Sequence, residues 1–220
     1  MTETMTDTAV KPRPRATKPA QPAPSGKTAV TLSEHIVEII SDSGEGAQRC
    51  GQTFGAIASQ MGNGVWTEEI IPAEIRPPAR SVAGGSGNRI RLGSGRITNA
   101  GNETDLVIAF NEQVLLGRVR TGELKSDCII LLEIMWRESR DQKIAASYIE
   151  THDELVKAGY RVIEIPMERE CRTIVADARR GKNMFALGIL CNISALTPNT
   201  PANKSPSRSA RKTSALFSRT

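Results

Sequence analysis

Runs of consecutive apolar residues recur along the middle of the chain, and most are followed by a turn and a helical pattern. Residues 35–40 form the first run, and it stops at a loop over residues 41–46. From residue 47 to residue 61 the apolar positions are spaced three and four apart. A continuous apolar run is typical of a strand covered on both faces, whereas the second spacing indicates a helix with one buried face. The chain therefore begins its folded part with a βα unit.

The same patterns continue to residue 193. They predict strands at residues 65–71, 105–110, 128–132 and 160–165, and helices at 111–115, 148–158, 168–180 and 183–193, with Asn111 as a cap and Gly181 as a breaker. Residues 73–87 contain two prolines and three glycines and predict a long loop. Residues 89–93 alternate polar and apolar, which predicts an antiparallel or edge strand with one wet face. The fold class expected is α/β, a three-layer Rossmann-like sandwich with a mostly parallel sheet.

Charge and proline mark the limits of this domain. The chain carries a formal charge of +5, but residues 1–28 hold five Lys or Arg against two acids, and residues 200–220 hold five against none. Eight of the twelve prolines also lie near the two ends. Such segments bury too little apolar surface to offset their chain entropy. We expect disordered tails at 1–30 and 196–220 around one domain at 31–195. A nucleic-acid partner would rest on these tails alone, so we expect no specific nucleic-acid binding.

The chain shows no apolar run of membrane-spanning length and no secretory signal at its start, so we expect a cytoplasmic protein without a membrane partner. Its four cysteines, Cys50, Cys128, Cys171 and Cys191, are far apart in the sequence. Their spacing matches neither a zinc knuckle nor the ligands of an iron–sulfur cluster, so we expect reduced, mostly buried thiols and no metal site.

The turn after the first strand is the place where a Rossmann-like domain would bind a phosphate. Ser43, Gly44 and Gly46 lie there, ahead of a helix N-terminus. The full fingerprint is missing, because Arg49 stands at the third glycine position and no Walker A lysine follows. Acidic residues also occupy the turn. A nucleotide site and a plain tight βα turn therefore both stay open, and the plain turn is favoured.

A second group of candidates surrounds the glycine-rich loop. Its members mix charged side chains with a serine, as an anion site or a facing protein surface would: Glu74, Arg76, Arg80, Ser86 and Arg89. A solvated loop is the simpler interpretation. His35 and His152 lie far apart with no nucleophile motif nearby, and no metalloprotease or calcium-binding motif occurs. The residues alone therefore indicate a fold without a catalytic constellation.

Four ordered stretches carry a resemblance to a known family. The run over residues 72–78, followed by residues 83–87, resembles the gamma domain of 2-oxoacid:ferredoxin oxidoreductases. Residues 43–48 are similar to that family's first glycine turn, 105–111 to its central strand and 183–190 to its closing helix. Within the family, the likeness is to the N-terminal part of the alpha subunit of the bacterial 2-oxoglutarate type. It covers about residues 33–193.

The resemblance implies a role inside a thiamine-diphosphate enzyme that oxidatively decarboxylates a 2-oxoacid, sends electrons through iron–sulfur clusters to ferredoxin and forms an acyl-CoA. In such an enzyme the gamma domain resembles a packing and assembly element. The implied partners are the thiamine-binding subunits and, indirectly, ferredoxin. Thiamine diphosphate, magnesium, iron–sulfur clusters and CoA would belong to the complex, with none bound by this chain alone. Ser43, Gly44, Gly46, Glu74, Arg76, Gly84 and Ser86 would contact a partner or cofactor.

The chain departs from the family pattern after residue 193. A long alpha subunit would continue into a thiamine domain, whereas here the sequence turns into a proline-containing and then basic segment. This predicts either a stand-alone gamma subunit or a truncated or frame-shifted alpha subunit, with an isolated chain that is inactive. A free-standing nucleotide-binding module built on the turn at residues 43–46 is the alternative.

Overall fold

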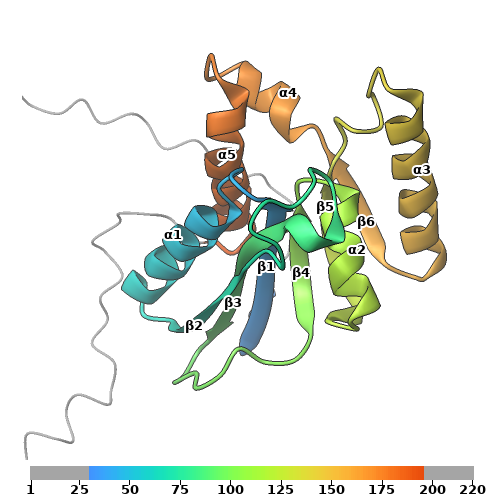
Figure 1. Cartoon of the computed structure of the whole chain (residues 1–220). Helices are drawn as coiled ribbons and strands as arrows, with labels where there is room; N and C mark the ends of the chain where they lie inside the picture. The colour runs from blue at the N-terminus through green and yellow to red at the C-terminus, as the bar shows by residue number, and fades with distance from the viewer. Residues whose placement is uncertain (1–29, 196–220) are drawn as a thin grey trace, which may run out of the picture. The chain divides into compact units, whose positions relative to one another are not determined.

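The computed structural model describes residues 30–195. The helices and strands in this range lie in one compact unit that begins at Leu32. They are, in order, β1 (Glu34–Asp42), α1 (Ala47–Gln60), β2 (Gly64–Ile70), the 3-10 turn η1 (Val82–Gly84), β3 (Gly85–Gly93), β4 (Thr104–Ala109), α2 (Glu112–Arg120), β5 (Leu124–Glu133), α3 (Gln142–Lys157), β6 (Arg161–Ile165), α4 (Met167–Arg172) and α5 (Ala178–Ile193) (Figure 1). The expected tails lie outside the described residues, except for Val30.

The strands form one six-stranded sheet in the order β2-β3-β1-β4-β5-β6. The neighbours β1, β4, β5 and β6 pair in parallel, while β3 runs antiparallel to both β1 and β2. Because β2 and β1 are each antiparallel to β3, they point the same way. The expected mostly parallel sheet is confirmed.

Helices cover both faces of this sheet. On one face, the apolar side chains of α1 and α5 contact alternate residues of β1 such as Val37 and Ile39. On the other face, Ile40 and Val107 belong to a second buried cluster with residues of α2 and α3. Figure 1 shows the sheet between these two helical layers. The three-layer sandwich is therefore confirmed, with a separate apolar core on each side of the sheet.

The structure corrects the expectation for β3. This strand begins at Gly85, so the loop does not extend to Gly87. It lies between β1 and β2 and is not an edge strand, and the side of it that was expected to be wet is mostly enclosed, since Arg89 is buried. Gly87 shows how tightly the strand fits: a Cβ there would lie 2.0 Å from the Ile39 carbonyl oxygen. In β3 the polar residue Arg89 therefore indicates a buried partner and not contact with solvent.

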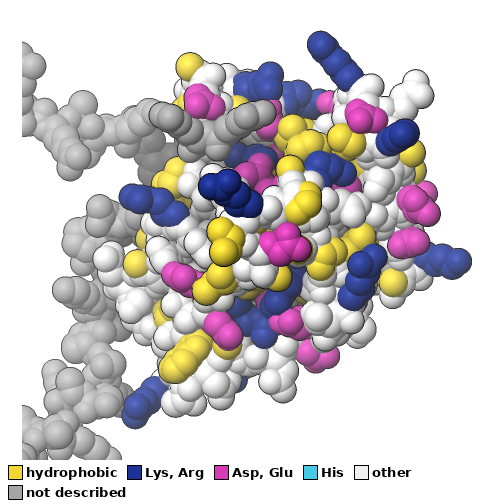
Figure 2. Space-filling view, in the orientation of Figure 1, with side chains coloured by type: hydrophobic (Ala, Val, Ile, Leu, Met, Phe, Trp, Pro, Cys, Tyr) yellow, Lys and Arg dark blue, Asp and Glu magenta, His cyan; other side chains and the backbone are white. Residues whose placement is uncertain are grey.

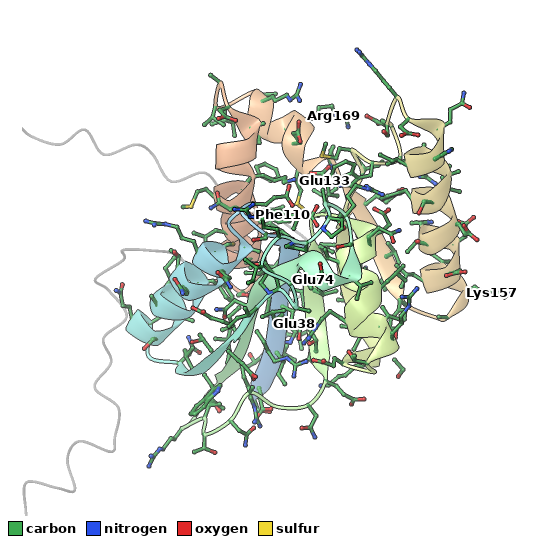
Figure 3. The ribbon with its side chains drawn as sticks, viewed as in Figure 1. Glu38, Glu74, Phe110, Glu133, Lys157 and Arg169 are labelled. Carbon is green, nitrogen blue, oxygen red and sulfur yellow. The ribbon has the colours of Figure 1, made fainter. Side chains whose placement is uncertain are left out.

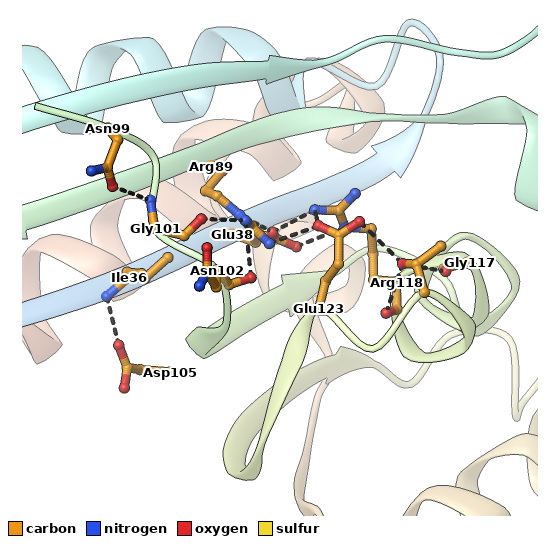
Figure 4. Close-up of polar contacts among 11 residues, drawn as sticks. Ile36, Glu38, Arg89, Asn99, Gly101, Asn102, Asp105, Gly117, Arg118 and Glu123 are labelled. Atoms are coloured by element: carbon orange, nitrogen blue, oxygen red, sulfur yellow. Dashed lines mark hydrogen bonds and ion pairs between the residues drawn. The ribbon is translucent and has the colours of Figure 1, made fainter.

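Those partners form an ionic network around Glu38 of β1, and Glu38 is fully buried. Glu38 Oε1 accepts hydrogen bonds from Arg89 Nε at 2.6 Å and from Arg118 Nη2 at 2.7 Å, and its Oε2 accepts from Arg118 Nε at 3.0 Å. Glu123 lies against both arginines (Figure 4). Arg89 also donates to the carbonyl oxygens of Gly101 and Asn102, at 3.1 and 3.2 Å. The network thus joins β1, β3, α2 and the loop that leads into β4.

Three helices differ from their expected bounds. The helix capped by Asn111, whose Oδ1 accepts from the Val114 amide, continues to Arg120, and α3 starts at Gln142. Gly181 lies inside α5 and does not end a helix. The break between α4 and α5 falls at residues 173–177. The reason is packing, because a Cβ on Gly181 would lie 2.5 Å from the Cys171 sulfur. This glycine permits contact between α4 and α5.

The Glu38 network yields a stability prediction with a matched control on the same strand. Glu38→Gln should lower the free energy of unfolding by about 3–5 kcal/mol, because two arginines would keep their places without the buried carboxylate that pairs with them. Glu34 also binds an arginine of β3, Arg91, through both carboxylate oxygens at 2.8 Å, but this pair is solvent-exposed. Glu34→Gln should therefore lower the free energy of unfolding by far less. Urea unfolding of both variants measures the difference, and equal losses would contradict this account.

Candidate functional site

The carboxyl ends of the parallel strands meet at one edge of the sheet, and the chain changes sides there. Helix α1 follows β1 onto one face, whereas α2 follows β4 onto the other. Open α/β sheets bind their ligands at such a switch point, outside the ends of the two strands. We therefore take the ends of β1 and β4, with the loops that surround them, as the candidate site. In Figure 3 Phe110, which directly follows β4, and Glu133, which ends β5, lie along this edge.

The turn from β1 into α1 occupies the centre of this edge. Gly44 and Gly46 have φ values of +89° and +88°, a conformation that favours glycine. A Cβ on Gly46 would lie 2.6 Å from Asn183 Nδ2, so α5 approaches the turn closely. Gly46 is the N-cap residue of α1 and supplies no side-chain cap. The predicted strand–turn–helix arrangement is confirmed, and the glycines are needed by the turn itself.

The acidic side chains of the turn are engaged within the chain. Asp42 accepts hydrogen bonds from the Arg80 amide at 3.0 and 2.9 Å. Glu45 accepts from Lys182 Nζ at 2.8 Å, and this lysine is almost fully buried, with its Nζ 4.9 Å from the centre of the Phe110 ring. The charges near the turn therefore fasten a loop and a helix to the end of β1.

A cavity of about 740 Å³ opens beside the turn. Its walls come from the turn, the start of the β5–α3 loop, α4 and the start of α5: Asp42, Ser43, Gly44, Glu45, Met135, Trp136, Glu168, Arg172, Ala176, Asp177 and Ala178. Four of these side chains are carboxylic acids and one is a guanidinium. A phosphate would meet repulsion here, which opposes the nucleotide interpretation of the turn.

Of the other sequence candidates, Arg80 contacts the end of β1 beside the turn, through Asp42, and the rest lie apart from it. Glu74 and Arg76 are exposed on the loop between β2 and η1, and Glu74 lies at the front of the view in Figure 3. Gly84 and Ser86 are buried, at the end of η1 and in β3. Arg89 belongs to the Glu38 network. The group expected around the glycine-rich loop is thus divided between an exposed tip and buried positions beneath it.

Sequence reasoning missed several buried polar residues at this edge. Glu112 and Glu133 are fully buried, and desolvation raises the pKa of Glu133, whose carboxylate accepts from the amides of Met135 and Glu168 at 3.0 and 2.9 Å. Glu133 directly follows a buried apolar run, and Glu112 follows another after Asn111. A charged residue just after a buried apolar run was the signal that could have identified both. The sequence around Lys182 carries no such signal, because its partner Glu45 lies 137 residues away.

The cysteines and histidines form no reactive group. Burial raises the pKa of the Cys50 thiol to about 12 and that of Cys128 to about 12. His35 contacts Asp105 at 3.6 Å, and His152 contacts Asp153 and stacks on the Tyr148 ring. Within residues 30–195, no three His, Cys, Asp or Glu side chains gather in a way that would hold a metal ion. In the same range, no helix is long and apolar enough to cross a membrane.

The fold is shared with solved structures of oxidoreductase subunits. A 2-oxoglutarate:ferredoxin oxidoreductase from Magnetococcus marinus, with 2-oxoglutarate, coenzyme A and succinyl-CoA bound, matches 73% of this chain and 24% of its own chain, at 21% identity and a TM-score of 0.54. The gamma subunit of a keto/oxoacid ferredoxin oxidoreductase from Geobacter sulfurreducens matches 76% of this chain and 79% of its own, at 12% identity and a TM-score of 0.52. These likenesses show an α/β fold common to such subunits.

The sequence comparisons identify the family. The family model of pyruvate ferredoxin/flavodoxin oxidoreductase matches residues 37–214, and the chain belongs to this family. The subunit KorA of the 2-oxoglutarate oxidoreductase of Mycobacterium tuberculosis is 28% identical over 166 residues, which cover 72% of this chain. The chain spans about a quarter of that relative, 25% of its length. The resemblance expected from the four sequence stretches is confirmed.

Thiol accessibility tests the assignment of the cysteines. At pH 8 a thiol with a pKa near 12 is ionised in about one molecule in ten thousand, so buried Cys50 and Cys128 should not react with a disulfide reagent. Cys171 is also buried, whereas Cys191 is partly exposed. We expect one fast thiol in the folded chain and four in guanidinium, counted by absorbance and located by mass spectrometry. Rapid native labelling of Cys50 would contradict this assignment.

Proposed function

We propose that this chain is a gamma-type domain of a 2-oxoacid:ferredoxin oxidoreductase, formed by residues 31–195, and that it serves in packing and assembly. Such an enzyme converts a 2-oxoacid and CoA into an acyl-CoA and carbon dioxide and passes two electrons to ferredoxin. We propose 2-oxoglutarate as the 2-oxoacid, which the name of the Mycobacterium tuberculosis relative supports. The observation that carries the proposal is the family match over residues 37–214.

The way in which the chain uses its polar residues supports the proposed role in assembly. At the switch point the acids of the turn are bound by Arg80 and Lys182, and Glu112 lies in a buried ion pair with Arg80. A catalytic group must reach the substrate and change its protonation or charge during the reaction. Side chains held in this way support the structure of the edge.

The implied cofactors do not fit the described residues of this chain. An iron–sulfur cluster requires several thiolates that converge on one point. Cys50 and Cys128 lie in different apolar cores on opposite faces of the sheet, and burial keeps both protonated. The cavity beside the turn is acidic, which disfavours the diphosphate of thiamine diphosphate. We therefore assign these cofactors to partner subunits and derive no chemical step through them here.

The partner-facing surface is proposed to be the carboxyl edge of the sheet. The turn at Ser43, Gly44 and Gly46 lies at this edge, and the loop that carries Glu74 and Arg76 is anchored to it through the Arg80–Asp42 contact. Gly84 and Ser86 are buried, so they support this surface from below. Loops at the ends of strands commonly carry function because the sheet holds them in place.

Co-expression tests the proposed function. The chain should co-purify with the thiamine diphosphate-binding subunit of the 2-oxoacid:ferredoxin oxidoreductase from the same organism, because an assembly domain is recovered with its complex. The isolated chain should reduce no ferredoxin with 2-oxoglutarate and CoA. Size-exclusion chromatography and ferredoxin absorbance measure the two results. The proposal is wrong if the chain stays separate from that subunit, or if the isolated chain reduces ferredoxin.

Calorimetric titration separates this proposal from a free-standing nucleotide-binding module. The acidic wall of the cavity and the missing third glycine predict no tight binding of NAD or NADP by the full chain. A dissociation constant at or below the micromolar range would favour the nucleotide module instead.

A further inference from the structure

The loop between β2 and η1 combines a closed neck, a fixed base and a fully exposed tip. The Ala73 amide donates to the Ala83 carbonyl oxygen at 2.9 Å, which closes residues 73–83 into a compact Ω-type loop. At its tip Ile75 is completely exposed, at 101% of the reference area, between exposed Glu74 and Arg76. Figure 2 shows hydrophobic side chains among acidic and basic ones on the face where this loop lies. We call residues 73–83 the tip loop.

Arg80 joins the base of the tip loop to three strand ends. Its amide donates to the Asp42 carboxylate at the end of β1. Its guanidinium pairs with fully buried Glu112, which begins α2 just after β4. The same guanidinium lies 4.3 Å from the centre of the Trp136 ring, beyond the end of β5. Arg80 therefore touches elements that are widely separated in sequence.

The backbone at Arg80 is strained, and the contacts of Arg80 hold it in this conformation. Its φ is +53°, a left-handed conformation that costs a residue with a side chain free energy. Such a conformation persists where the surroundings over-determine it. Trp136 is itself fixed, because its Nε1 donates to the Phe110 carbonyl oxygen at 2.8 Å. The anchor is thus rigid on both sides.

Packing beneath the tip loop adds to this rigidity. A Cβ on Gly84 would lie 3.3 Å from Pro77 Cβ and 3.3 Å from the Pro78 carbonyl oxygen, so the loop folds closely over this glycine. Val82 fits against α2, where a Cβ on Gly117 would lie 2.9 Å from its Cγ1. The Ser81 hydroxyl donates to the Pro78 carbonyl oxygen at 2.7 Å. A loop ordered in this way loses little entropy when it binds.

We infer that Arg80 is a positioning residue that presets the tip loop, and that Ile75 is the anchor by which the loop docks into the thiamine-binding subunit. This inference rests on the proposed function for the identity of the partner. The flanking charges define the chemistry of the partner surface, an apolar pocket with a cationic group facing Glu74 and an anionic group facing Arg76. A fixed, fully exposed isoleucine suits a pocket in which it becomes buried.

Hydrogen exchange of the free full-length chain tests the positioning role. Arg80→Ala should speed exchange of the Ala73 amide and the other tip-loop amides by about tenfold or more, and Arg80→Lys should restore part of the protection. The double variant Arg80→Ala with Glu112→Gln removes both charges, in case the single variant does not fold. Arg76→Ala is the control, because it removes an arginine that anchors nothing. Unchanged exchange in the folded Arg80 variants would overturn the positioning role.

Association kinetics with the co-expressed thiamine-binding subunit test the docking role. Ile75→Ala should weaken binding by about tenfold or more, without changing the melting temperature of the free chain. The Arg80 variants should slow association, since the loop must then order on binding. Ile149→Ala, at an exposed isoleucine of α3, is the control. If the wild-type chain binds and Ile75→Ala binds equally well, the docking inference is wrong. If the wild type does not bind at all, the proposed function fails as well.

Discussion

A single buried carboxylate, that of Glu38, lets a polar strand occupy the interior of this sheet. Its strand, β1, pairs with β4 in parallel and with β3 antiparallel. Arg89 of β3 would carry an uncompensated charge in this place, and the cost of such a charge is large. Glu38 and Glu123 neutralise it, and Arg118 of α2 completes the network. The ion pairs therefore fix the register between β1 and β3 as well as the position of α2.

Buried charges are paired in the same way at the carboxyl edge of the sheet, where open α/β sheets bind their ligands. Here Arg80, Lys182 and the acids they bind hold together the ends of β1, β4 and β5, together with α5. Each of these cations thus links elements that are far apart in the sequence.

The sequence predicted those parts of the fold that local pattern determines. Apolar runs located β1, β4, β5 and β6, and Asn111 located the start of α2. The strand expected at residues 89–93 and its antiparallel pairing are confirmed, but its wet face is wrong, because the burial of Arg89 depends on Glu38, 51 residues away. The break expected at Gly181 is also wrong, because the role of this glycine depends on contact with Cys171. The turn at Ser43–Gly46 was predictable from its glycines, whereas the separation of Glu74 and Arg76 from Gly84 and Ser86 needed three-dimensional contacts.

Two arginines of one loop show why residue type alone could not define the site. Arg76 and Arg80 are four positions apart, and both belong to the group expected around the glycine-rich loop, but only Arg76 was expected to contact a partner or cofactor. Arg76 is exposed, whereas the side chain of Arg80 is only 11% exposed and is bound to Glu112. The difference arises from α2 and the β5–α3 loop, which supply the carboxylate and the Trp136 ring at the base of the loop. One arginine thereby becomes part of the scaffold that holds the loop, and the other stays at the surface that the scaffold presents.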